Sequence, residues 1–397
     1  MARIVMMLNR LVIGGAPLDT VQLAGFLSNH HEVYLIVGDK NDSELDAFFL
    51  AEQYNQLHLV HITDMQRSLN LMKDVRAFFH ILKLLRKIRP DIVHTHGAKS
   101  GLLGRLAAYA VGVKIIIHTY HGHVFHSYFN SFVSSLIVFA ERTLARISSK
   151  IIAISEKQKI ELVEAYRICQ ANKIEVIKLG IEISKFTGSR MMERRTDFRQ
   201  QYFVRDEEVA IGIVGRIVPI KGHAFFADIT AELLRMSRKP LKFFVIGDGI
   251  TRKDLEKIFL EKNIRTTYFP EEATDAQVIF TSWIVEIEKA MNGLDIILLT
   301  SLNEGTPVTL LEAQAASIPV VASDVGGVSE VVLHGKSGFV IKYGDLNAFV
   351  ERLLLLIDDP SMRKKMGLDG KGFIEANHGK QQQFLSIEKL YRQLLEV

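Results

Sequence analysis

Two carboxylates and a glycine turn mark the segment 301–313, which follows a predicted strand. Pro307 suits the first turn of a helix, so the backbone N–H groups of Gly305 and Thr306 would point at whatever lies above the strand end. A helix N-terminus favours negative charge, and a diphosphate fits such a place. Further along the helix, Glu312 has a carboxylate that can accept hydrogen bonds from both hydroxyls of a ribose.

The position of Glu304 decides whether it acts together with Glu312. On one continuous helix the two carboxylates would lie about 80° apart around the axis, so they converge only if Glu304 belongs to the preceding loop. The alternative interpretation of the whole segment is a helix cap followed by a solvated glutamate.

A second segment, 215–223, carries two cations between a predicted strand and a predicted helix. Gly215 permits a tight turn close to a ligand. Arg216 offers a fork of donors and Lys221 a compact charge, and both suit phosphate oxygens. Together they could stabilise a departing diphosphate without a metal ion. The alternative is a surface loop with two solvated charges.

The elements that must position these segments are short β-branched runs that alternate with helical patterns. Most of the runs are almost continuously apolar, which is typical of parallel strands covered on both faces. The predicted strands are 3–8, 32–37, 92–95, 114–119, 150–154 and 174–177, and then 209–214, 242–246, 277–280, 295–299, 319–322 and 338–341. Between them lie helical stretches such as 72–88 and 223–237. This alternation predicts an α/β protein with two doubly wound, parallel-sheet domains.

The alternating pattern dissolves near 183–200, where the composition becomes polar and charged, and we interpret this stretch as a linker. We therefore predict one domain over residues 1–188 and another over residues 189–379. The tail reads as a helix, and we expect residues 380–397 to pack back on the first domain.

Composition narrows the function classes. The chain has 397 residues, 48% of them hydrophobic, so each of two domains can bury a core. The formal net charge of +4 permits an anionic substrate but does not argue for nucleic acid. A single cysteine, Cys169, excludes a disulfide framework. Neither a signal peptide nor a membrane-spanning run is apparent, so we expect a cytoplasmic protein. Nothing in the sequence indicates an oligomeric state.

Taken together, the motifs resemble those of the retaining GT-B glycosyltransferases of family four. In the second half the resemblance rests on Gly215-Arg216, Lys221-Gly222, the pair Glu304 and Glu312, and the run 325–330. In the first half, 10–16 resembles the family's glycine-rich first loop, and 94–101 and 118–126 resemble segments of its bacterial cell-surface polysaccharide members. The resemblance covers nearly the whole chain. It implies two Rossmann-like domains that face an interdomain cleft.

The resemblance also implies roles for individual residues. Arg216 and Lys221 would bind the donor phosphates, and Glu312 would hold the ribose. Glu304 would contact the transferred sugar and phosphate. The donor-binding residues implied by the family are Gly14, Gly15, Gly215, Arg216, Lys221, Thr281, Ser282, Trp283, Glu304, Gly305, Thr306, Pro307 and Glu312. The catalytic residues are His121, Arg216, Lys221 and Glu304, and the acceptor-binding residues are Lys99 and His123.

The implied reaction transfers a hexosyl or N-acetylhexosaminyl unit from a UDP-sugar to a glycan or a polyprenyl-diphosphate-linked acceptor, in bacterial surface polysaccharide synthesis. Retention of the anomeric configuration is implied as well. We expect no cofactor and no metal ion, because the sequence contains no Asp-x-Asp pair and the cations at 216 and 221 can take its place.

Three alternatives remain open at this stage. A GT-B UDP-sugar 2-epimerase would share these motifs, and a two-domain nucleotide-sugar-binding protein would bind the donor without turnover. An NAD-dependent dehydrogenase is disfavoured, because neither Gly14-Gly15 nor the run 247–249 completes the dinucleotide fingerprint.

Two further patterns each have a plain interpretation and a functional one. Six histidines gather at 94–126, and we interpret them as loop histidines plus one active-site residue, His121, in preference to a zinc site. The amphipathic helix predicted at 72–89 carries several basic residues. We interpret it first as a solvated face packed on a sheet, and second as a surface that docks on anionic lipid at the inner face of the plasma membrane.

Overall fold

The computed structural model describes residues 1–397 except 13, 41–46, 67–69, 123–130, 270–274 and 397. The chain divides into two compact units. The first comprises Met1–Lys178 together with Gln381–Val397, and the second comprises Leu179–Lys380. The units thus meet in the chain after Lys178, earlier than the boundary after Gly188 that we predicted from composition.

In the described residues, the first unit contains a sheet of seven strands in the order β3-β2-β1-β4-β5-β6-β7, paired in parallel. The strands are β1 (Arg3–Leu8), β2 (Glu32–Gly38), β3 (Leu57–Ile62), β4 (Ile92–His96), β5 (Ile115–Tyr120), β6 (Lys150–Ala153) and β7 (Ile174–Val176). The chain adds β2 and β3 on one side of β1, and then adds β4 to β7 on the other side, so the strand order reverses between β1 and β4. Open α/β sheets bind ligands outside the carboxyl ends of the strands at such a reversal.

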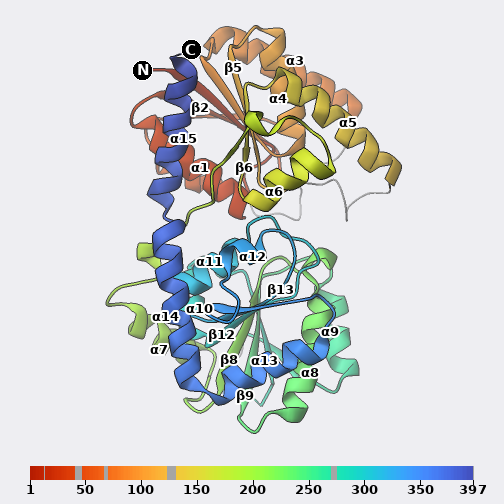
Figure 1. Ribbon diagram of the computed structural model, residues 1–397, viewed down its shortest axis with the longest axis vertical. Helices are drawn as coiled ribbons and strands as arrows, with labels where there is room; N and C mark the ends of the chain where they lie inside the picture. Colours follow the sequence, from red (N-terminus) through yellow and green to blue (C-terminus); the bar gives the residue numbers. More distant parts are fainter. Residues whose placement is uncertain (13, 41–46, 67–69, 123–130, 270–274, 397) are drawn as a thin grey trace. The chain divides into compact units, whose positions relative to one another are not determined.

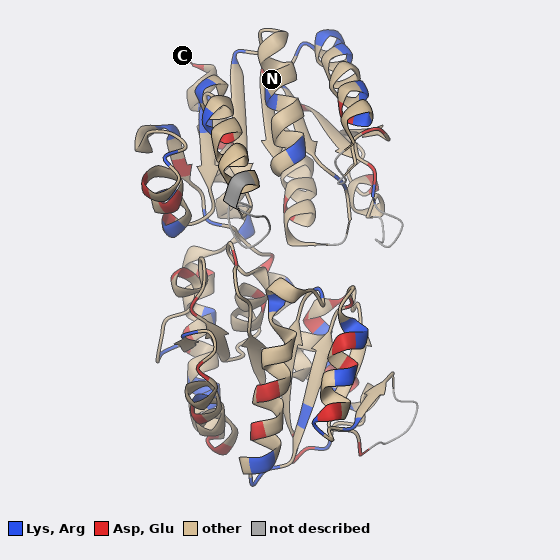
Figure 2. Cartoon of the chain, turned by 90° about the vertical axis from the view of Figure 1, so that its right-hand side faces the viewer, with Lys and Arg blue, Asp and Glu red and all other residues tan. Residues whose placement is uncertain are grey.

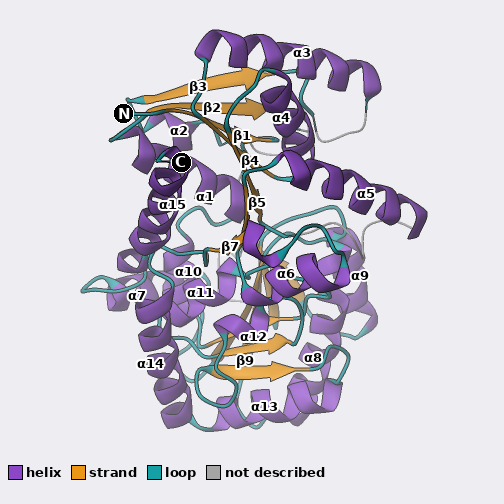
Figure 3. Cartoon of the chain, turned by 45° about the horizontal axis from the view of Figure 1, so that its top comes forward, coloured by secondary structure: helices purple, strands orange, loops and turns teal. Residues whose placement is uncertain are grey.

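Helices cover both faces of this sheet (Figure 3). They are α1 (Gly15–Ser28), α2 (Phe49–Glu52), α3 (Leu71–Ile88), α4 (Ala98–Ala110), α5 (Ser131–Ile147), α6 (Glu156–Ile160) and α15 (Lys380–Leu395). One apolar core joins β1 and β2 to α1, α2 and α15. Another joins the opposite face of β1 to α3 and α4. Burial on both faces explains why the central strands are almost continuously apolar.

Helix α15 belongs to the first unit although it follows the whole second unit in sequence (Figure 1). The ring of Phe384 lies 5.4 Å from that of Phe26 on α1. The Gln383 amide donates to the Asp19 carboxylate at 3.0 Å. Tyr391 is fully buried in the core that it shares with β1.

The second unit repeats the architecture, with the order β10-β11-β9-β8-β12-β13-β14 among its described residues. Its strands are β8 (Val209–Val214), β9 (Leu241–Ile246), β10 (Thr266–Tyr268), β11 (Val278–Ser282), β12 (Ile296–Leu299), β13 (Val320–Ser323) and β14 (Gly338–Ile341). The reversal lies between β8 and β12, which are the strands that precede the two chemically distinctive segments. The prediction of two doubly wound α/β units is therefore confirmed.

Two groups of helices sandwich this second sheet. Helices α8 (His223–Met236), α9 (Arg252–Glu261) and α13 (Leu346–Asp358) cover one face. The other face is covered by α7 (Met191–Gln201), α10 (Ile287–Gly293), α11 (Val308–Ala315), α12 (Val328–Val331) and α14 (Pro360–Asn377).

The stretch that we interpreted as a linker is a folded part of the second unit. Most of it forms helix α7. This helix packs closely on α10, because a Cβ added at Gly293 of α10 would lie only 2.2 Å from the ring of Phe198 on α7. Arg195 and Arg199 both bond to the Asp295 carboxylate, at 2.7 and 3.3 Å. The charged composition of the stretch therefore reflects ion pairs at the start of β12 as well as solvent exposure.

None of the helices in the described part of the chain is long and apolar enough to cross a membrane.

Candidate functional site

The loops that follow β8, β12 and β13 meet at the carboxyl edge of the second sheet. Gly222 adopts φ 65°, and a Cβ there would lie 2.0 Å from the carbonyl oxygen of Thr300. The Thr300 hydroxyl donates to the Gly222 carbonyl at 3.1 Å. The Leu302 N–H donates to the Ile220 carbonyl at 2.9 Å. Only a glycine permits this close approach, so the loop after β8 packs directly against the loop after β12.

This seating brings the predicted residues Lys221 and Glu304 together. The Lys221 ammonium lies 2.6 Å from Oε1 of Glu304, which also accepts a 2.6 Å hydrogen bond from the Ser301 hydroxyl. The Glu304 side chain is 9% exposed and that of Lys221 27%. A largely buried carboxylate is therefore paired with a cation that still reaches solvent.

The loop after β13 supports the Glu304 backbone from the other side. Gly326 adopts φ 51°, and a Cβ at this position would lie 1.7 Å from the Glu304 carbonyl oxygen. The next N–H, of Gly327, donates to the carbonyl of Gly305 at 2.9 Å. Three loops from neighbouring strands thus position one carboxylate.

Helix α11 begins just beyond these contacts. Pro307 is its N-cap, and no side chain in the described part of the chain caps its first turn. Glu304 lies in the preceding loop, which is the arrangement that the sequence required for Glu304 and Glu312 to act together. Thr306 is 8% exposed. The open start of α11 suits an anion, because the helix dipole and the first N–H groups both favour negative charge.

Glu312 lies on α11 and is partly buried. Among the contacts of the described residues, its carboxylate makes no hydrogen bond or ion pair. Burial raises the pKa of Glu312 to about 7, and the nearby charges of Lys380, Glu288 and Lys185 act on it more weakly. A carboxyl that titrates near neutral pH and lacks partners is consistent with a ligand-binding role.

The turn after β8 is shaped by glycines. Gly215 adopts φ 147°. A Cβ added at Gly247 would lie only 2.1 Å from the Gly215 carbonyl oxygen, so Gly247 must lack a side chain. Arg216 follows in this turn and is exposed. Within the described part of the chain its guanidinium forms no ion pair or hydrogen bond, so it is available to an anionic ligand.

The end of β11 and the loop after it carry the donor residues Thr281, Ser282 and Trp283 that were predicted in this unit. Thr281 is fully buried, whereas Trp283 is 36% exposed. Ser282 adopts φ 55°, accepts from the N–H of Gly247, and donates its hydroxyl to Asp248 at 3.2 Å. The loops after β9 and β11 are therefore bonded to one another, and the first of them contacts Gly215.

Several residues that shape the site were not predicted. Ser301 bonds Glu304, Gly326 supports its backbone, and Asp248 anchors Ser282. The sequence motif 325–330 includes Gly326, but its contact with the Glu304 backbone becomes visible only in the folded structure. His223 opens α8 beside Lys221 in sequence, and burial lowers its pKa to about 4.

In the first unit, the predicted glycine-rich loop leads into α1. Gly14 is the N-cap and Gly15 the first helical residue. Both are exposed. Lys99 lies in the first turn of α4, and its ammonium is 2.6 Å from the Asp74 carboxylate on α3. His123 lies outside the described residues, as does Ile13.

The histidines of β4 and β5 are buried at the carboxyl edge of the first sheet. The rings of His94 and His96 lie 4.1 Å apart, so both are on one face of β4. His94 bonds the Tyr391 hydroxyl at 2.5 Å and the Thr119 hydroxyl at 2.6 Å. Burial lowers the pKa of His94 to about 3.

His96 contacts the predicted active-site residue directly. Its Nδ1 lies 2.9 Å from Nε2 of His121, which follows β5. His96 is 1% exposed, and its burial holds its pKa well below the usual value. The described residues include no cluster of three or more histidine, cysteine, aspartate or glutamate side chains that could hold a metal ion.

A buried ion pair contacts the end of β5. Arg105 of α4 donates to both carboxylate oxygens of Glu141 on α5, at 2.9 and 2.7 Å. The Tyr120 hydroxyl, at the end of β5, also donates to this carboxylate. The pair therefore joins two helices to the strand that leads to His121.

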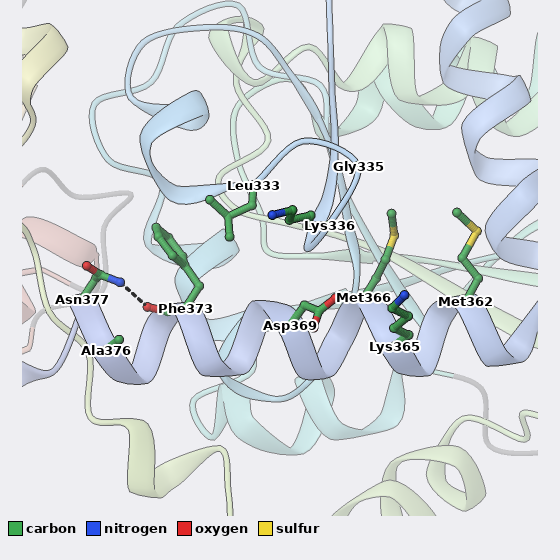
Figure 4. A pocket seen from close by; sticks show the side chains of 10 residues that line it. All are labelled: Leu333, Gly335, Lys336, Met362, Lys365, Met366, Asp369, Phe373, Ala376 and Asn377. Atoms are coloured by element: carbon green, nitrogen blue, oxygen red, sulfur yellow. Dashed lines mark hydrogen bonds between the residues drawn. The ribbon is translucent and has the colours of Figure 1, made fainter.

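A surface hollow of about 670 Å³ lies elsewhere in the second unit (Figure 4). Side chains of α14, including Met366 and Phe373, line it together with Leu333 and Lys336. None of the predicted site residues is among its lining.

Comparison with known proteins identifies both halves of the chain. The family described as Glycosyltransferase Family 4 matches residues 13–185, and the family described as Glycosyl transferases group 1 matches residues 194–373. A UDP-Gal:alpha-D-GlcNAc-diphosphoundecaprenol alpha-1,3-galactosyltransferase of Escherichia coli is 29% identical over 74% of this chain and 73% of its own length. The capsular polysaccharide biosynthesis glycosyltransferase CapM of Staphylococcus aureus is 25% identical, over 96% and 94%.

Solved structures share the fold over the full length. Anabaena Alr3699/HepE, in complex with UDP and glucose, superposes with a TM-score of 0.82 at 18% identity. The superposition covers 99% of this chain and all of the other.

Proposed function

Because the chain belongs to the GT-B glycosyltransferases of family four, we propose that it transfers a hexosyl or N-acetylhexosaminyl unit from a UDP-sugar, with retention of the anomeric configuration and without a metal ion. The acceptor that we propose is a glycan or a polyprenyl-diphosphate-linked sugar of a bacterial surface polysaccharide. The glycosyltransferase activity follows from the family; donor, acceptor and stereochemistry are the proposal.

One observation carries the proposal most directly. Lys221 and Glu304 are held together at the reversal of the second sheet, beside the open start of α11. A carboxylate that can accept from sugar hydroxyls thus lies next to a cation that can bind phosphate. The pairing also keeps the cation in place before a ligand arrives, so little ordering is required on binding.

The chemistry requires charge stabilisation more than a nucleophile. In the proposed step the bond between the anomeric carbon and the diphosphate oxygen breaks, and the electron pair leaves with the diphosphate. Arg216, Lys221 and the α11 N-terminus stabilise the charge that develops there. The acceptor hydroxyl forms the new bond on the same face, and its proton passes to an oxygen of the departing diphosphate.

The other residues bind and orient the donor. Glu312 accepts hydrogen bonds from the ribose, and Thr281, Ser282 and Trp283 contact the base. In the first unit, the backbone at Gly14 and Gly15 approaches the diphosphate, and His121 contacts the transferred sugar. Lys99 and His123 contribute to acceptor binding.

Relatives support the choice of substrates. The E. coli relative is named for transfer from UDP-Gal to an N-acetylglucosamine on a diphosphoundecaprenol carrier. A structural neighbour has been solved with UDP-glucose. We extend both ligand classes, a UDP-linked donor and a lipid-linked acceptor, to this protein.

The test is a transfer assay with the full chain. A panel of UDP-hexoses and UDP-N-acetylhexosamines is offered with a polyprenyl-diphosphate N-acetylglucosamine acceptor, with and without EDTA. We expect one donor to be consumed at an EDTA-independent rate, and the product to show the donor's anomeric configuration by NMR. Release of an epimerised free sugar without acceptor would indicate an epimerase, and UDP binding without turnover of any acceptor would indicate a binding protein.

We also propose that the protein works from the cytoplasm at the inner face of the plasma membrane, where such an acceptor is available. On α3, Leu71, Met72 and Phe79 are 80%, 73% and 59% exposed, so its apolar stripe is not fully covered by the sheet. Basic residues lie among them, coloured blue in Figure 2. An exposed helix with apolar and basic side chains binds anionic lipid surfaces.

Vesicle sedimentation tests this surface. Binding to vesicles that contain phosphatidylglycerol should fall with added salt and with a Met72→Ser/Phe79→Ser double variant. Equal sedimentation of the variant and the wild type, or no binding at low salt, would remove the membrane from the proposal.

A further inference from the structure

Three neighbouring helices of the first unit turn apolar side chains toward solvent. Helix α4 contacts both α3 and α5 (Figure 3). A helix that covers a sheet normally presents polar residues on its outer side. Here the large hydrophobic residues that are at least 39% exposed are Leu71, Met72, Val75 and Phe79 on α3, Leu102, Leu106 and Tyr109 on α4, and Leu136 and Phe139 on α5. We call this set the apolar face. Soluble proteins rarely leave such a surface in water without a function.

The outer side of α4 carries no charge. Its exposed residues are Ala98, Leu102, Leu106, Tyr109 and Ala110. Their spacing of mostly three or four residues places them along one side of the helix. The two charged residues of α4 are used elsewhere, since Lys99 is paired with Asp74 of α3 and Arg105 is buried against Glu141 of α5. The centre of the apolar face therefore has no polar outer layer.

The charges on the three helices are almost all positive. Their sequences contain two acidic residues, Asp74 and Glu141, and each of these is paired with a cation. The exposed cations are Arg76, Lys83, Arg86, Lys87, Arg142 and Arg146. These charges would repel a second copy of the same surface, whereas they attract anionic lipid headgroups.

Apolar and basic residues follow a common order along the helices. Helices α3, α4 and α5 follow the parallel strands β3, β4 and β5, so each begins at the carboxyl edge of the sheet. On α3 the exposed apolar residues occupy 71–79, and three of the exposed cations follow at 83–87. On α5, Leu136 and Phe139 precede both exposed arginines. Tyr109 lies in the last turn of α4, and a tyrosine suits the boundary between headgroups and acyl chains.

We propose that the apolar face inserts into an anionic bilayer, and that the first unit docks at a tilt. The starts of α3, α4 and α5 lie below the headgroups, and their basic ends lie at headgroup level, where the long stem of Arg76 also lets its guanidinium reach. This inference rests on the proposed membrane location and deepens it, because it adds α4 and α5 to the contact and gives the contact a direction. The tilt directs the carboxyl edge, where His121 and Lys99 lie, toward the diphosphate of a lipid-linked acceptor.

The depth of single residues tests the tilt. The chain has one cysteine, so Cys169→Ser provides a background for single cysteines labelled with the environment-sensitive dye NBD. With phosphatidylglycerol vesicles, labels at Leu102→Cys and Leu136→Cys should shift to the blue and be quenched most by nitroxides within the acyl chains. A label at Arg146→Cys should be quenched most by nitroxides on the headgroups. Equal depth at the three positions, or water-like emission at Leu102 and Leu136, would overturn the proposal.

The opposite face of the same sheet supplies the control for labelling. Leu385 lies on α15 and is 50% exposed, and α15 packs on the face of the sheet opposite to α3 and α4. A label at Leu385→Cys should keep its water-like emission in the presence of vesicles. A blue shift there as large as at Leu136 would mean that the dye reports non-specific adsorption, and the assigned surface would be wrong.

Vesicle affinity provides the second readout. Tyr109→Ser/Leu136→Ser removes two side chains that are 64% and 61% exposed, so the fold should persist, which thermal unfolding checks. We expect the affinity for phosphatidylglycerol vesicles to fall at least about tenfold, because two apolar side chains no longer leave water. The matched variant is Leu260→Ser/Leu368→Ser, at positions of the second unit that are 74% and 55% exposed, and it should bind as the wild type does. Equal affinities of the two variants would contradict insertion.

The outcomes separate this inference from the function on which it rests. If the protein sediments with anionic vesicles while the labels stay in water, the cations hold the membrane from outside, so insertion is wrong and the membrane location stands. If the protein does not sediment, both are wrong, and transfer to a water-soluble acceptor decides the enzymatic function separately. A lipid-independent dimer that Tyr109→Ser/Leu136→Ser abolishes would assign the apolar face to a second copy of the chain and overturn the proposal.

Discussion

The carboxyl edges of the two sheets are built from different kinds of side chain. In the first unit, the ends of β4 and β5 carry buried imidazoles and hydroxyls, and His94 bonds both Thr119 of β5 and Tyr391 of α15. In the second unit, the loops after β8 and β12 carry glycines and a charged pair, Lys221 and Glu304. The same architecture therefore supports a neutral, rigid edge in one unit and a charged one in the other.

The difference follows from what each edge is able to bind. A buried histidine is neutral and directional, so it can orient a group by hydrogen bonds but cannot offset a charge. A partly exposed lysine and an open helix start can offset the charge of a diphosphate. The comparison predicts that variants of the first edge change stability and orientation, whereas variants of the second change the rate of the charged step.

The largest effect is expected beneath the neutral edge. Arg105→Met leaves the Glu141 carboxylate buried without its cation, and loss of one partner of a buried ion pair costs about 3–5 kcal/mol. The free energy of unfolding by urea measures this cost. Arg252→Met, which removes partly exposed pairs with Asp248 and Glu256, should cost about 1 kcal/mol or less. Equal losses of unfolding free energy in the two variants would contradict the idea that the ion pair of the first unit is more costly to break than those of the second.

The next effect concerns the charged edge. Lys221→Met should lower kcat by at least ~10²-fold, because one group that offsets leaving-group charge typically supplies about 3 kcal/mol. The free energy of unfolding should also fall, because the largely buried Glu304 carboxylate loses its cation, but by less than in Arg105→Met, because Lys221 is partly exposed. Lys257→Met, at an exposed pair with Glu261 on α9, is the control and should leave kcat unaltered. A Lys221→Met enzyme with normal turnover would remove the cationic clamp from the mechanism.

Glu312 gives a pH-dependent effect of intermediate size. Its pKa of about 7 in the folded protein lies above its usual value of 4.5, so the folded state holds a proton that the unfolded chain releases. Stability therefore falls as pH rises from 4.5 to 7 and levels off above. Glu312→Gln should stabilise the protein by on the order of 2 kcal/mol at pH 8 and by little at pH 4.5.

Thermal or urea unfolding at the two pH values measures this difference. Glu375→Gln, at an exposed carboxylate on α14, is the matched variant and should show no such pH dependence. If UDP affinity is unaltered in Glu312→Gln and Glu312→Ala alike, the carboxyl does not hold the ribose.

The smallest effect tests how the loops hold Glu304. In Gly326→Ala, the new Cβ would overlap the Glu304 carbonyl, so we expect the loop to shift and kcat to fall about tenfold, or 1.4 kcal/mol. Gly344→Ala is the control, since Gly344 also has a positive φ but no atom of the described residues lies within 4 Å of the added Cβ. Identical rates in the two variants would mean that the contact with Gly326 does not position Glu304.

Apolar periodicity was sufficient to predict the central strands of both sheets, whose ends differ from the structure by a residue or two. The missed strands, β3 and β10, are edge strands with polar residues interleaved, and their sequences lack the continuous apolar run that burial on two faces requires. The helix α7 was missed because its charged residues, which form ion pairs with Asp295, have the composition of a linker.

The site was predictable where motifs are local and not where contacts are long-range. Residue types and spacing indicated Lys221, Glu304 and Glu312, whose roles stay predictions. The contact of Lys221 with Glu304 joins residues 83 positions apart, and that of His96 with His121 spans 25. Neither spacing has a helical or strand period, so only the parallel order of the strands brings these pairs together.

The placement of α15 has a consequence for how the protein is made. The hydroxyl that bonds His94 is supplied by Tyr391, which the ribosome adds only after the whole second unit. The nascent first unit therefore waits through the synthesis of its neighbour with an imidazole unsatisfied and a core face uncovered. At translation rates of about 5–20 residues per second, this interval lasts on the order of ten seconds or more. A chaperone that shields apolar surface during that interval would protect the sheet from aggregation.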